Sequence, residues 1–367
     1  MKDIVVVISN GARYDPRVSK IVNSLNKKYS IVVLGWNRQK IPVDRENEFL
    51  TDLKLFNLHA PYGRVSLISN IPMLICLPLF WLWILFNLII YKPRVTHACN
   101  LDTVFPCLIY KYIFKAKLVF DIFDRYAMAY ISPKLSALYS LINSWEEAFA
   151  RASDVLINVS DDLQLSFKKK PIECVTIMNC PNELIFERPK ATVFTVIFPG
   201  HVRKHRCLEV LLNVVRQLEG IQLLVSGEII DKELFYKILN TENVKYCGLL
   251  PNDQLLFLEQ SAHAVVALYN LEIPLNRFAM PNKLFEAMMC GLPIITNVAR
   301  ELIMETNSGI MVEYDNEKQL KSALVTLRDD ALLRERLGNN GRSAFYKKYN
   351  WKIMEDRLYR IYYDIIR

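Results

Sequence analysis

Residues 2–36 read KDIVVVISNGARYDPRVSKIVNSLNKKYSIVVLGW and carry the clearest folding signal in the chain. The β-branched run at 2–9 predicts a strand, and Asp15 and Pro16 suit the N-cap and the first position of a helix. Apolar residues then recur at helical spacing until a second β-branched run at 29–36. A strand, a helix and a strand in this order predict a βαβ unit with parallel strands and a right-handed crossover.

The alternation of short strands and helices continues from this unit to residue 178 and restarts at residue 194. Between the two runs, residues 181–189 carry two prolines and mixed polar residues, which is typical of a linker. A chain of 367 residues is also too long for one ordinary domain. We therefore expect two doubly wound, Rossmann-like α/β domains at 1–185 and 190–346, with ligands bound in the cleft between them, beyond the carboxyl ends of the strands.

The composition excludes several classes of protein. Hydrophobic residues make up 52% of the chain, which is enough for full cores and excludes a mainly disordered chain. The net charge of +8 favours anionic partners, but the basic residues are spread over both halves without an aromatic–basic stacking module, so we expect no nucleic-acid binding. None of the eight cysteines forms a C-x-x-C pair, and the short apolar run after Met1 indicates a buried strand rather than a signal peptide. We therefore expect free thiols and a cytoplasmic protein.

One run, 65–91, contains no charged residue and is bracketed by Arg64 and Lys92. It is long enough to cross a membrane, but the strands on both sides of it are predicted in one domain, which forbids a true span. Pro72 and Pro78 are expected to break the first turns of a continuous helix. Two alternatives stay open: insertion into a membrane surface, which the excess of apolar surface favours, and packing inside the domain.

Two glycine-containing loops follow predicted strands and precede helices, where free backbone amides can meet a phosphate. Gly11 lies in the first loop, and the alternative there is an ordinary turn. In the second loop, 200–206, five of the seven residues carry or can carry a positive charge. Arg203 and Arg206 in this loop could clamp a pyrophosphate, with a solvated basic turn as the alternative.

Carboxylates in two further segments are candidates for binding hydroxyl groups. A helix is predicted to begin near Asn282, which puts Glu286 one turn into it, where it could accept hydrogen bonds from a ribose diol. The alternative is a carboxylate that caps the first turn of that helix. At the end of a predicted strand, Asp121 and Asp124 lie beside Arg125 and could orient a substrate hydroxyl, with a salt-bridged loop as the alternative.

Four motifs occur in this chain in the order in which a known family has them. The most specific is PNKLFE at 281–286 followed by CGLP at 290–293, and the weaker ones are DPRV at 15–18, DVLINVS at 154–160 and YNW at 349–351. On these motifs the chain resembles, over nearly its whole length, the retaining glycosyltransferases of family 4. The resemblance implies the GT-B fold, in which two Rossmann-like domains face a cleft and the last segment, 347–367, returns to the N-terminal domain.

The resemblance also implies roles for matching residues. Glu286 would bind the donor ribose, the backbone at Pro281 and Asn282 would meet the sugar and phosphates, and the loop at Gly200 would neutralise the diphosphate. The expected catalytic residues are Asp124, Arg203, Arg206, Lys283 and Glu286, and the expected donor-binding residues are Gly11, Gly200, His201, Lys204, Pro281, Asn282 and Leu284.

The chain departs from the family pattern at several positions. Phe278 stands where the family has the first Glu of its E-x7-E pattern, the residue that touches the donor sugar. His201 replaces the Arg of a Gly-Arg pair, and Arg206-Cys207 replaces a Lys-Gly pair. The frequent His of the first-half loop falls at Phe123, which leaves Asp124 as its polar neighbour.

The function implied by the resemblance is transfer of a sugar from a nucleoside diphosphate sugar to an acceptor hydroxyl with retention, in capsule, lipopolysaccharide or lipid-linked glycan assembly. Basic side chains and helix N-termini would stabilise the leaving diphosphate, so we expect no metal cofactor. The expected partners are the nucleotide sugar, a glycan or lipid-linked acceptor and, through 65–91, the cytoplasmic face of the inner membrane. Alternatives are an epimerase or phosphorylase on the same fold, or a non-catalytic membrane-bound partner subunit.

Overall fold

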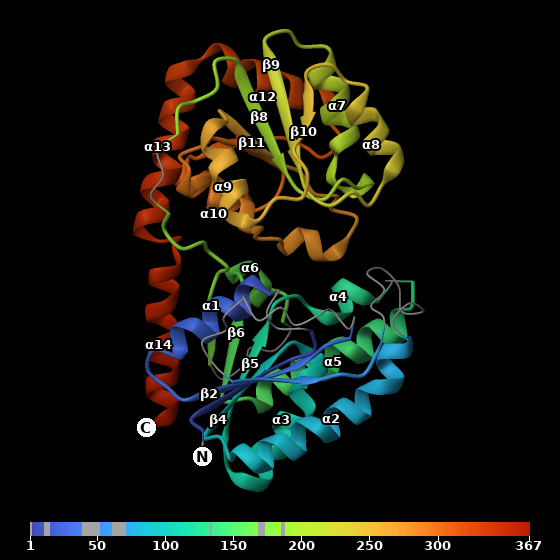
Figure 1. Cartoon of the computed structure of the whole chain (residues 1–367), viewed down its shortest axis with the longest axis vertical. Coiled ribbons are helices and arrows are strands. Elements are labelled where there is room, and N and C mark those ends of the chain that lie inside the picture. The colour runs from blue at the N-terminus through green and yellow to red at the C-terminus, as the bar shows by residue number, and fades with distance from the viewer. Residues whose placement is uncertain are drawn as a thin grey trace. The chain divides into compact units, whose positions relative to one another are not determined.

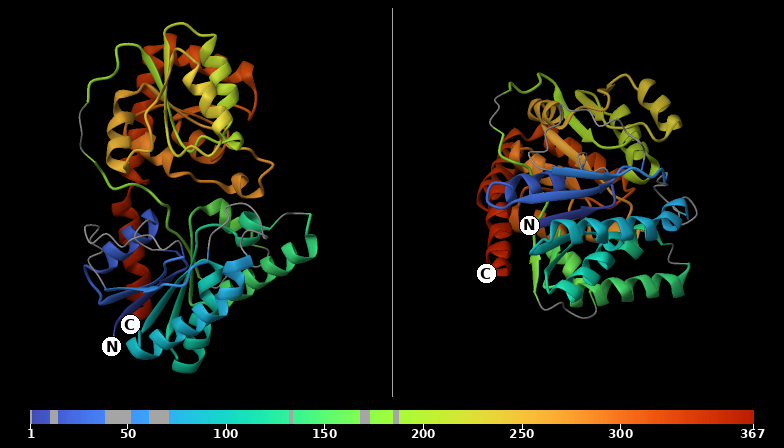
Figure 2. Two further views of the ribbon diagram at one scale, coloured as in Figure 1. Left: turned by 45° about the vertical axis from the view of Figure 1, so that its right-hand side comes forward. Right: turned by 60° about the horizontal axis from the view of Figure 1, so that its bottom comes forward.

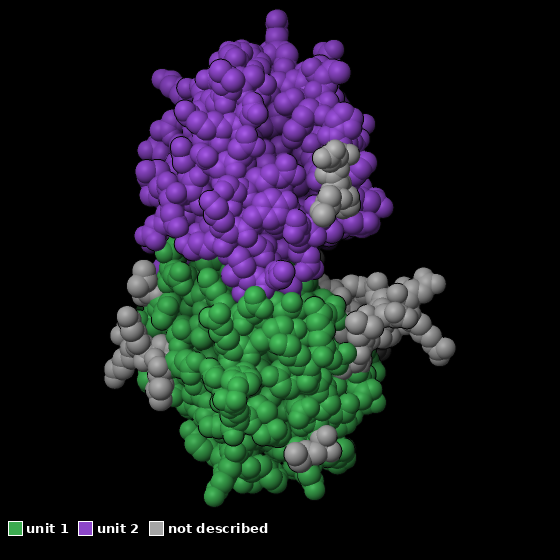
Figure 3. All heavy atoms as spheres, turned by 90° about the vertical axis from the view of Figure 1, so that its left-hand side faces the viewer, with its two compact units in different colours: residues 1–178, 354–367 green, residues 179–353 purple. Residues whose placement is uncertain are grey.

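The computed structural model contains two compact units, each built around a parallel sheet with helices on both faces (Figure 1). One unit comprises Met1–Met178 and Met354–Arg367, and the other comprises Asn179–Ile353 (Figure 3). The structure describes residues 2–10, 15–38, 52–60, 71–131, 134–167, 173–184 and 188–367. The predicted fold class, two doubly wound α/β halves, is confirmed.

The first unit has a seven-stranded parallel sheet in the order β3-β2-β1-β4-β5-β6-β7. Its central strand β1 reads IVVVI and is buried at every position, because helices cover both faces of the sheet. The crossovers build the sheet outwards from β1 in both directions, which is the doubly wound pattern. The strands are β1 (Ile4–Ile8), β2 (Ile31–Trp36), β3 (Asp52–Phe56), β4 (Val95–Cys99), β5 (Lys117–Ile122), β6 (Val155–Asn158) and β7 (Cys174–Thr176).

The helices of the first unit lie in two layers (Figures 1 and 2). α1 and the last helix, α14, pack on one face of the sheet, and α2, α3 and α5 pack on the other. Asp15 caps α1 as predicted, since its side chain accepts hydrogen bonds from the amides of Arg17 and Val18, both at 3.0 Å. The helices are α1 (Pro16–Leu25), α2 (Ile71–Tyr91), α3 (Leu101–Phe114), α4 (Tyr126–Tyr130), α5 (Ser136–Ala152), α6 (Asp161–Leu165) and α14 (Trp351–Ile366).

Helix α2 corrects one expectation from the sequence. It runs without interruption through Pro78, so the prediction that Pro78 breaks the helix is wrong. Pro72 lies in the first turn, where a missing amide costs nothing. Pro78 withholds one hydrogen bond inside the helix, but Phe80 fixes the helix just beyond it, with its ring 4.8 Å from that of Trp36. The uncharged run therefore supplies a helix of the first unit, partly packed on its sheet, as expected.

The final helix α14 contacts both β4 and α1 within the first unit. The hydroxyl of Tyr362 lies 2.5 Å from Nδ1 of His97 on β4, and both side chains are fully buried. The Tyr359 hydroxyl donates to the carbonyl oxygen of Ser24 at 2.8 Å. Because these partners lie more than 260 residues away in the sequence, the contacts join the end of the chain to the first sheet.

The second unit has a six-stranded parallel sheet in the order β10-β9-β8-β11-β12-β13. Its strands are β8 (Phe194–Pro199), β9 (Ile221–Ser226), β10 (Val244–Tyr246), β11 (Ala264–Ala267), β12 (Ile294–Thr296) and β13 (Gly309–Met311). Apolar residues of the sheet, α7, α8 and α12 form one core, and α10 packs against α13 elsewhere in the unit. The helices are η2 (Lys204–Arg206), α7 (Leu208–Arg216), α8 (Lys232–Leu239), α9 (Asn252–Ser261), η3 (Pro274–Phe278), α10 (Asn282–Met289), α11 (Arg300–Thr306), α12 (Glu317–Asp329) and α13 (Ala331–Lys347).

Candidate active-site residues

Gly200 and Lys283 come together at the carboxyl end of β8. Gly200 follows the last residue of that strand, and its amide donates to the carbonyl oxygen of Ser226 on β9 at 2.7 Å. A Cβ atom added to Gly200 would meet Nζ of Lys283 at 2.8 Å, so the ammonium group lies directly against the glycine backbone. A glycine at this position therefore provides the space that the Lys283 side chain occupies.

Lys283 lies in a cluster of charged and polar side chains. Burial and, next to it, the positive charge of Arg206 lower the pKa of Lys283 to about 8, against the opposing effects of the Glu286 and Glu259 carboxylates. The guanidinium of Arg206 stacks on the ring of Tyr269, 3.9 Å from its centroid. The loop after β8 and the start of α10 thus bring two predicted basic residues, Arg206 and Lys283, close enough for their charges to interact.

Two glutamates lie beside these cations. Glu286 is the fifth residue of α10, only 8% exposed and outside the first helical turn, so the alternative that it caps the helix is wrong. Glu259 on α9 is fully buried, and neither of its carboxylate oxygens has a hydrogen-bond partner among the described residues. Burial and then the nearby charge of Glu286 raise the pKa of Glu259 well above its ordinary value. The two glutamates and the two cations therefore influence one another electrostatically.

The basic side chains of the loop after Gly200 contact different partners. The ring of His201 lies 3.7 Å from a carboxylate oxygen of Glu228. Lys204 is exposed and lies near two carboxylates, 3.9 Å from Asp231 and 3.7 Å from Glu233, which fits the alternative of a solvated basic turn. Arg206, by contrast, turns toward Tyr269 and Lys283. Arg203 lies directly before η2 with an extended backbone, and it is half-buried.

The remaining predicted donor-binding residues differ in exposure. Pro281 and Asn282 are partly exposed at the N-terminus of α10, where backbone amides have no partner within the helix. The Leu284 side chain is fully buried and its amide donates to the carbonyl oxygen of Pro281 at 3.0 Å, so this residue packs in the core rather than facing a ligand. Gly11 lies outside the residues that the structure describes.

The first unit holds a second buried network at the carboxyl end of β5. Arg17 donates to both carboxylate oxygens of Asp121, at 3.1 and 2.7 Å, and to the carbonyl oxygen of Ile177 at 2.6 Å. Nε2 of His97 lies 3.3 Å from Asp121. Although burial opposes it, the positive charge of Arg17 with the His97 contact holds the pKa of Asp121 below its ordinary value.

Asp124 does not take part in the hydrogen bonds that Asp121 makes with Arg17 and His97. The predicted partner Arg125 turns away and pairs with Glu146, with Nε 2.5 Å from the carboxylate, so the expectation that the two aspartates work beside Arg125 is wrong. Asp124 is exposed as a residue, but the protein atoms around its carboxylate desolvate it and, with the charge of Glu146, raise its pKa to about 7.

Several residues of these clusters were not predicted from the sequence. Gly227 has φ of +152°, and a Cβ atom there would lie 2.2 Å from the carbonyl oxygen of Gly200, so only glycine lets β9 pass the loop. Its position directly after a predicted strand was a usable signal. Glu259, Tyr269 and His97 gave none, because each lies in an ordinary apolar stretch whose neighbours come from distant segments.

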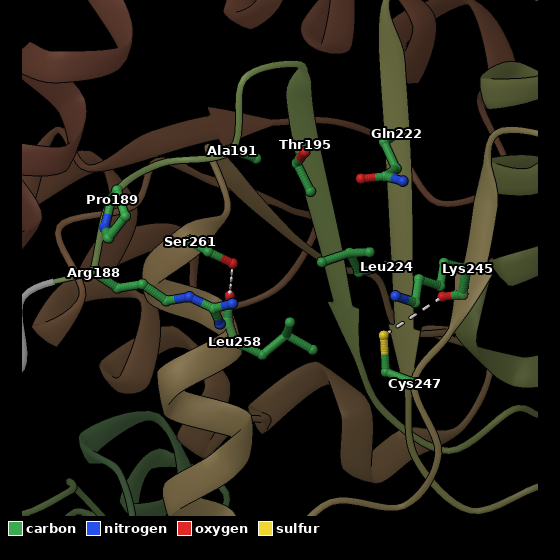
Figure 4. A pocket seen from close by; sticks show the side chains of 10 residues that line it. All are labelled: Arg188, Pro189, Ala191, Thr195, Gln222, Leu224, Lys245, Cys247, Leu258 and Ser261. Carbon is green, nitrogen blue, oxygen red and sulfur yellow. Dashed lines mark hydrogen bonds between the residues drawn. The ribbon is translucent and has the colours of Figure 1, made fainter.

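One cavity of about 300 Å³ lies in the second unit, apart from the predicted site residues (Figure 4). Strand residues of β8 and β9 form its floor, and the segment that enters β8 forms its rim. Its lining mixes apolar and basic side chains, and none of the predicted catalytic or donor-binding residues contributes to it. The lining residues are Arg188, Pro189, Ala191, Thr195, Gln222, Leu224, Lys245, Cys247, Leu258 and Ser261.

Sequence comparison matches part of the chain to known proteins. Residues 193–330 match the family model of the glycosyl transferases group 1. The chain is 24% identical over 188 residues to the capsular polysaccharide biosynthesis glycosyltransferase CapM of Staphylococcus aureus, covering 47% of each chain. It is also 24% identical over 162 residues to an uncharacterized glycosyltransferase of Methanocaldococcus jannaschii, covering 42% of this chain and 44% of the relative. The matches thus span just under half the length of these relatives.

Solved structures resemble the chain over its whole length. Sucrose-phosphate synthase from Thermosynechococcus elongatus superposes with a TM-score of 0.78 at 16% identity, covering 100% of this chain and 99% of that one. Anabaena HepE in complex with UDP gives 0.77 at 13% identity, covering 99% and 100%. At these identities the likeness establishes the fold alone, which is the GT-B fold with its two Rossmann-like halves. The chain therefore has the GT-B fold, and residues 193–330 resemble the glycosyl transferases group 1 in sequence.

Proposed function

We propose that the protein is a retaining, hexosyl-type glycosyltransferase that moves a sugar from a nucleoside diphosphate sugar to an acceptor hydroxyl. The observation that carries the proposal is the Lys283 ammonium held against the backbone of Gly200 beside Arg206. Two cations beside a glycine backbone at the end of a strand suit a diphosphate, which is also the ligand class in the HepE complexes with UDP and UDP-glucose.

The charge balance of this cluster fits a leaving diphosphate. Burial and the charge of Arg206 disfavour the ammonium form of Lys283 in spite of the nearby Glu286 and Glu259, and a bound diphosphate would favour it. Charge that develops on the leaving group would meet Lys283, Arg206 and the amides at the start of α10. In this arrangement the protein itself neutralises the leaving group, and we propose that no metal cofactor is required.

Glu286 would bind the ribose of the donor. The charge of its carboxylate acts on both Lys283 and the buried Glu259. An ionised carboxylate accepts hydrogen bonds from both hydroxyls of a diol. Asp124, in the first unit, is the residue that we propose near the acceptor hydroxyl, since its pKa of about 7 suits proton exchange at neutral pH.

The setting that we propose is assembly of a cell-surface polysaccharide or lipid-linked glycan. The partial match to CapM, a capsular polysaccharide enzyme, supports it. We further propose that the protein acts as a peripheral protein on the cytoplasmic face of the inner membrane, held through the segment 65–91. Its helix is long and apolar enough to cross a membrane by length and composition, and 33% of it is buried within the unit.

A second candidate function is a non-catalytic partner subunit that binds the nucleotide. The half-buried side chain of Phe278 on η3 favours it, because the family has there a glutamate that touches the sugar. An aromatic ring cannot accept hydrogen bonds from sugar hydroxyls as a carboxylate does.

A panel of uridine and guanosine diphosphate sugars, each incubated with and without membrane extract, tests these alternatives. Release of nucleoside diphosphate together with a sugar-bearing product, only when extract is present, supports the transferase. Interconversion of the sugar without extract would instead identify an epimerase. Binding of nucleotide without any turnover would identify the non-catalytic subunit.

A further inference from the structure

Helix α2 presents a long row of apolar side chains to the outside of the first unit. Seven large side chains on it are between 39% and 71% exposed, and they are spread over its whole length. A soluble helix normally turns charged residues to that side, but α2 has none. The exposed residues are Leu74, Ile75, Leu79, Leu82, Phe86, Ile89 and Ile90.

The apolar surface continues onto the two helices beside α2. α3 packs against α2 and α5 packs against α3, so the three helices lie side by side on one face of the sheet (Figure 2). The ring of Trp81 on α2 lies 4.8 Å from that of Phe105 on α3, which joins two of them. Exposed large side chains on or next to the two helices are Phe105, Tyr112, Ile113, Phe114, Leu135, Leu141 and Trp145.

The exposed charges on these three helices and on the residues that directly follow them are positive. The only carboxylates on the three helices, Asp102, Glu146 and Glu147, are no more than 9% exposed, and Glu146 is paired with Arg125. Exposed cations follow the helices instead, Lys92 directly after α2 and Lys115 directly after α3. A surface that exposes apolar groups and cations while it buries its carboxylates is complementary to anionic phospholipid headgroups over an acyl layer.

The opposite side of α2 is fixed in the core of the unit. Four side chains, Met73, Phe80, Ile84 and Leu88, are at most 2% exposed. Phe80 packs on Trp36 of β2 and, at 5.6 Å between ring centroids, on Phe56 of β3. A spanning orientation would expose this stripe and remove one layer of the sheet, at a cost comparable with the stability of a whole domain. The helix can therefore meet a membrane only sideways.

We infer that α2, α3 and α5 together form a docking surface for an anionic bilayer, on which α2 lies in the plane of the membrane. The inference deepens the proposed membrane location and rests on that part of the proposed function, adding the two further helices, the lipid charge and the orientation. A second copy of the chain is a poorer occupant, because two copies of this surface would offer each other exposed cations and no exposed carboxylate from these helices.

Vesicle flotation with the full-length protein tests the inference. Vesicles of phosphatidylcholine with about one-third phosphatidylglycerol are compared with vesicles of phosphatidylcholine alone. We expect flotation with the anionic vesicles, a loss of at least about tenfold in partitioning for the double variant Leu82→Glu, Phe86→Glu, and a smaller loss for Lys92→Glu, Lys115→Glu. The matched control is Leu332→Glu, at a side chain 80% exposed on α13 of the second unit, which should float as the wild type does.

Three results would overturn the inference. One is absence of flotation with anionic vesicles, and another is equal flotation of the wild type and the Leu82→Glu, Phe86→Glu variant. The third is resistance of the bound protein to alkaline carbonate washing, which a spanning helix would give and an in-plane helix should not. Sedimentation of the lipid-free protein identifies a dimer, and a dimer abolished by the same variant would assign the surface to a second copy.

Nucleotide binding separates this inference from the proposed enzymatic function. Calorimetry with uridine and guanosine diphosphate is run on the wild type and on the Leu82→Glu, Phe86→Glu variant, whose thermal unfolding is checked first. Unchanged nucleotide affinity with lost flotation supports the docking surface. Flotation of a protein that binds neither nucleotide would leave the docking surface standing and remove the donor site.

Discussion

The affinity of the protein for a nucleoside diphosphate should depend on pH through Lys283. The free protein has a pKa of about 8 at this residue, caused first by burial and then by the charge of Arg206. A bound diphosphate favours the ammonium form, so binding should raise that pKa and draw a proton into the complex. Affinity is therefore full below pH 8 and is lost as the pH rises through that value.

The size of the effect follows from the protonated fraction. With a pKa of about 8, Lys283 is about 90% protonated at pH 7 and about 10% protonated at pH 9. If only the ammonium form binds, the dissociation constant should rise about tenfold between these two pH values. Calorimetric titration with uridine or guanosine diphosphate at constant ionic strength measures it.

Two variants make the prediction specific. Lys283→Met should bind the nucleotide at least about tenfold more weakly at pH 7 and show no decline between pH 7 and 9. Lys283→Arg keeps its charge over this range and should also lack the decline. A decline of the same size in Lys283→Arg would assign the titration to another group, and unchanged affinity of Lys283→Met at pH 7 would refute the role of Lys283.

Three further predictions concern catalysis and stability. Glu286→Ala should lower turnover at least about tenfold with thermal unfolding unchanged, and unchanged turnover would remove the donor-site assignment. Asp121→Asn should lower the free energy of unfolding of the first unit by about 3–5 kcal/mol, because it leaves Arg17 buried without its counter-ion. Since the folded-state pKa of Asp121 is lowered, the stabilisation by its ion pair with Arg17 is present at neutral pH and should be lost as the pH falls below about 4. Phe80→Ala should cost about 3–5 kcal/mol by leaving a cavity under α2, whereas the exposed Leu82→Ala should cost far less in the same denaturant titration.

The sequence predicted those features that depend on local pattern. The β-branched runs of β1 and β2, the Asp15 cap and the restart of alternation at β8 are all local, and each is present in the structure. The course of α2 through Pro78 was missed, because contacts of Phe80 with distant strands decide it. The helix that follows the loop 200–206 begins only at Leu208, since Cys207 takes a left-handed conformation with φ of 55°.

The same distinction applies to the candidate site. Gly200, Lys283, Arg206 and Glu286 lie in motifs, so their types and spacing were visible in the sequence. Whether a charge lies near a carboxylate depends on tertiary contacts, which is why the contacts of Lys204 with Asp231 and of Arg125 with Glu146 could not be predicted from the sequence. Glu259 could not be predicted, because its importance comes only from burial beside Glu286 and Lys283.

Transfer of a labelled sugar is the most direct test of the proposed reaction. The protein is incubated with its preferred nucleotide sugar, labelled in the sugar, and with membrane extract, and the label is followed into the lipid and glycan fractions by mass spectrometry. We predict that wild-type protein adds one labelled sugar to an acceptor and releases the nucleoside diphosphate, and that Glu286→Ala does neither at a comparable rate. Label that stays on the nucleotide with every donor and extract, or that reaches the acceptor equally well with Glu286→Ala, would contradict the account.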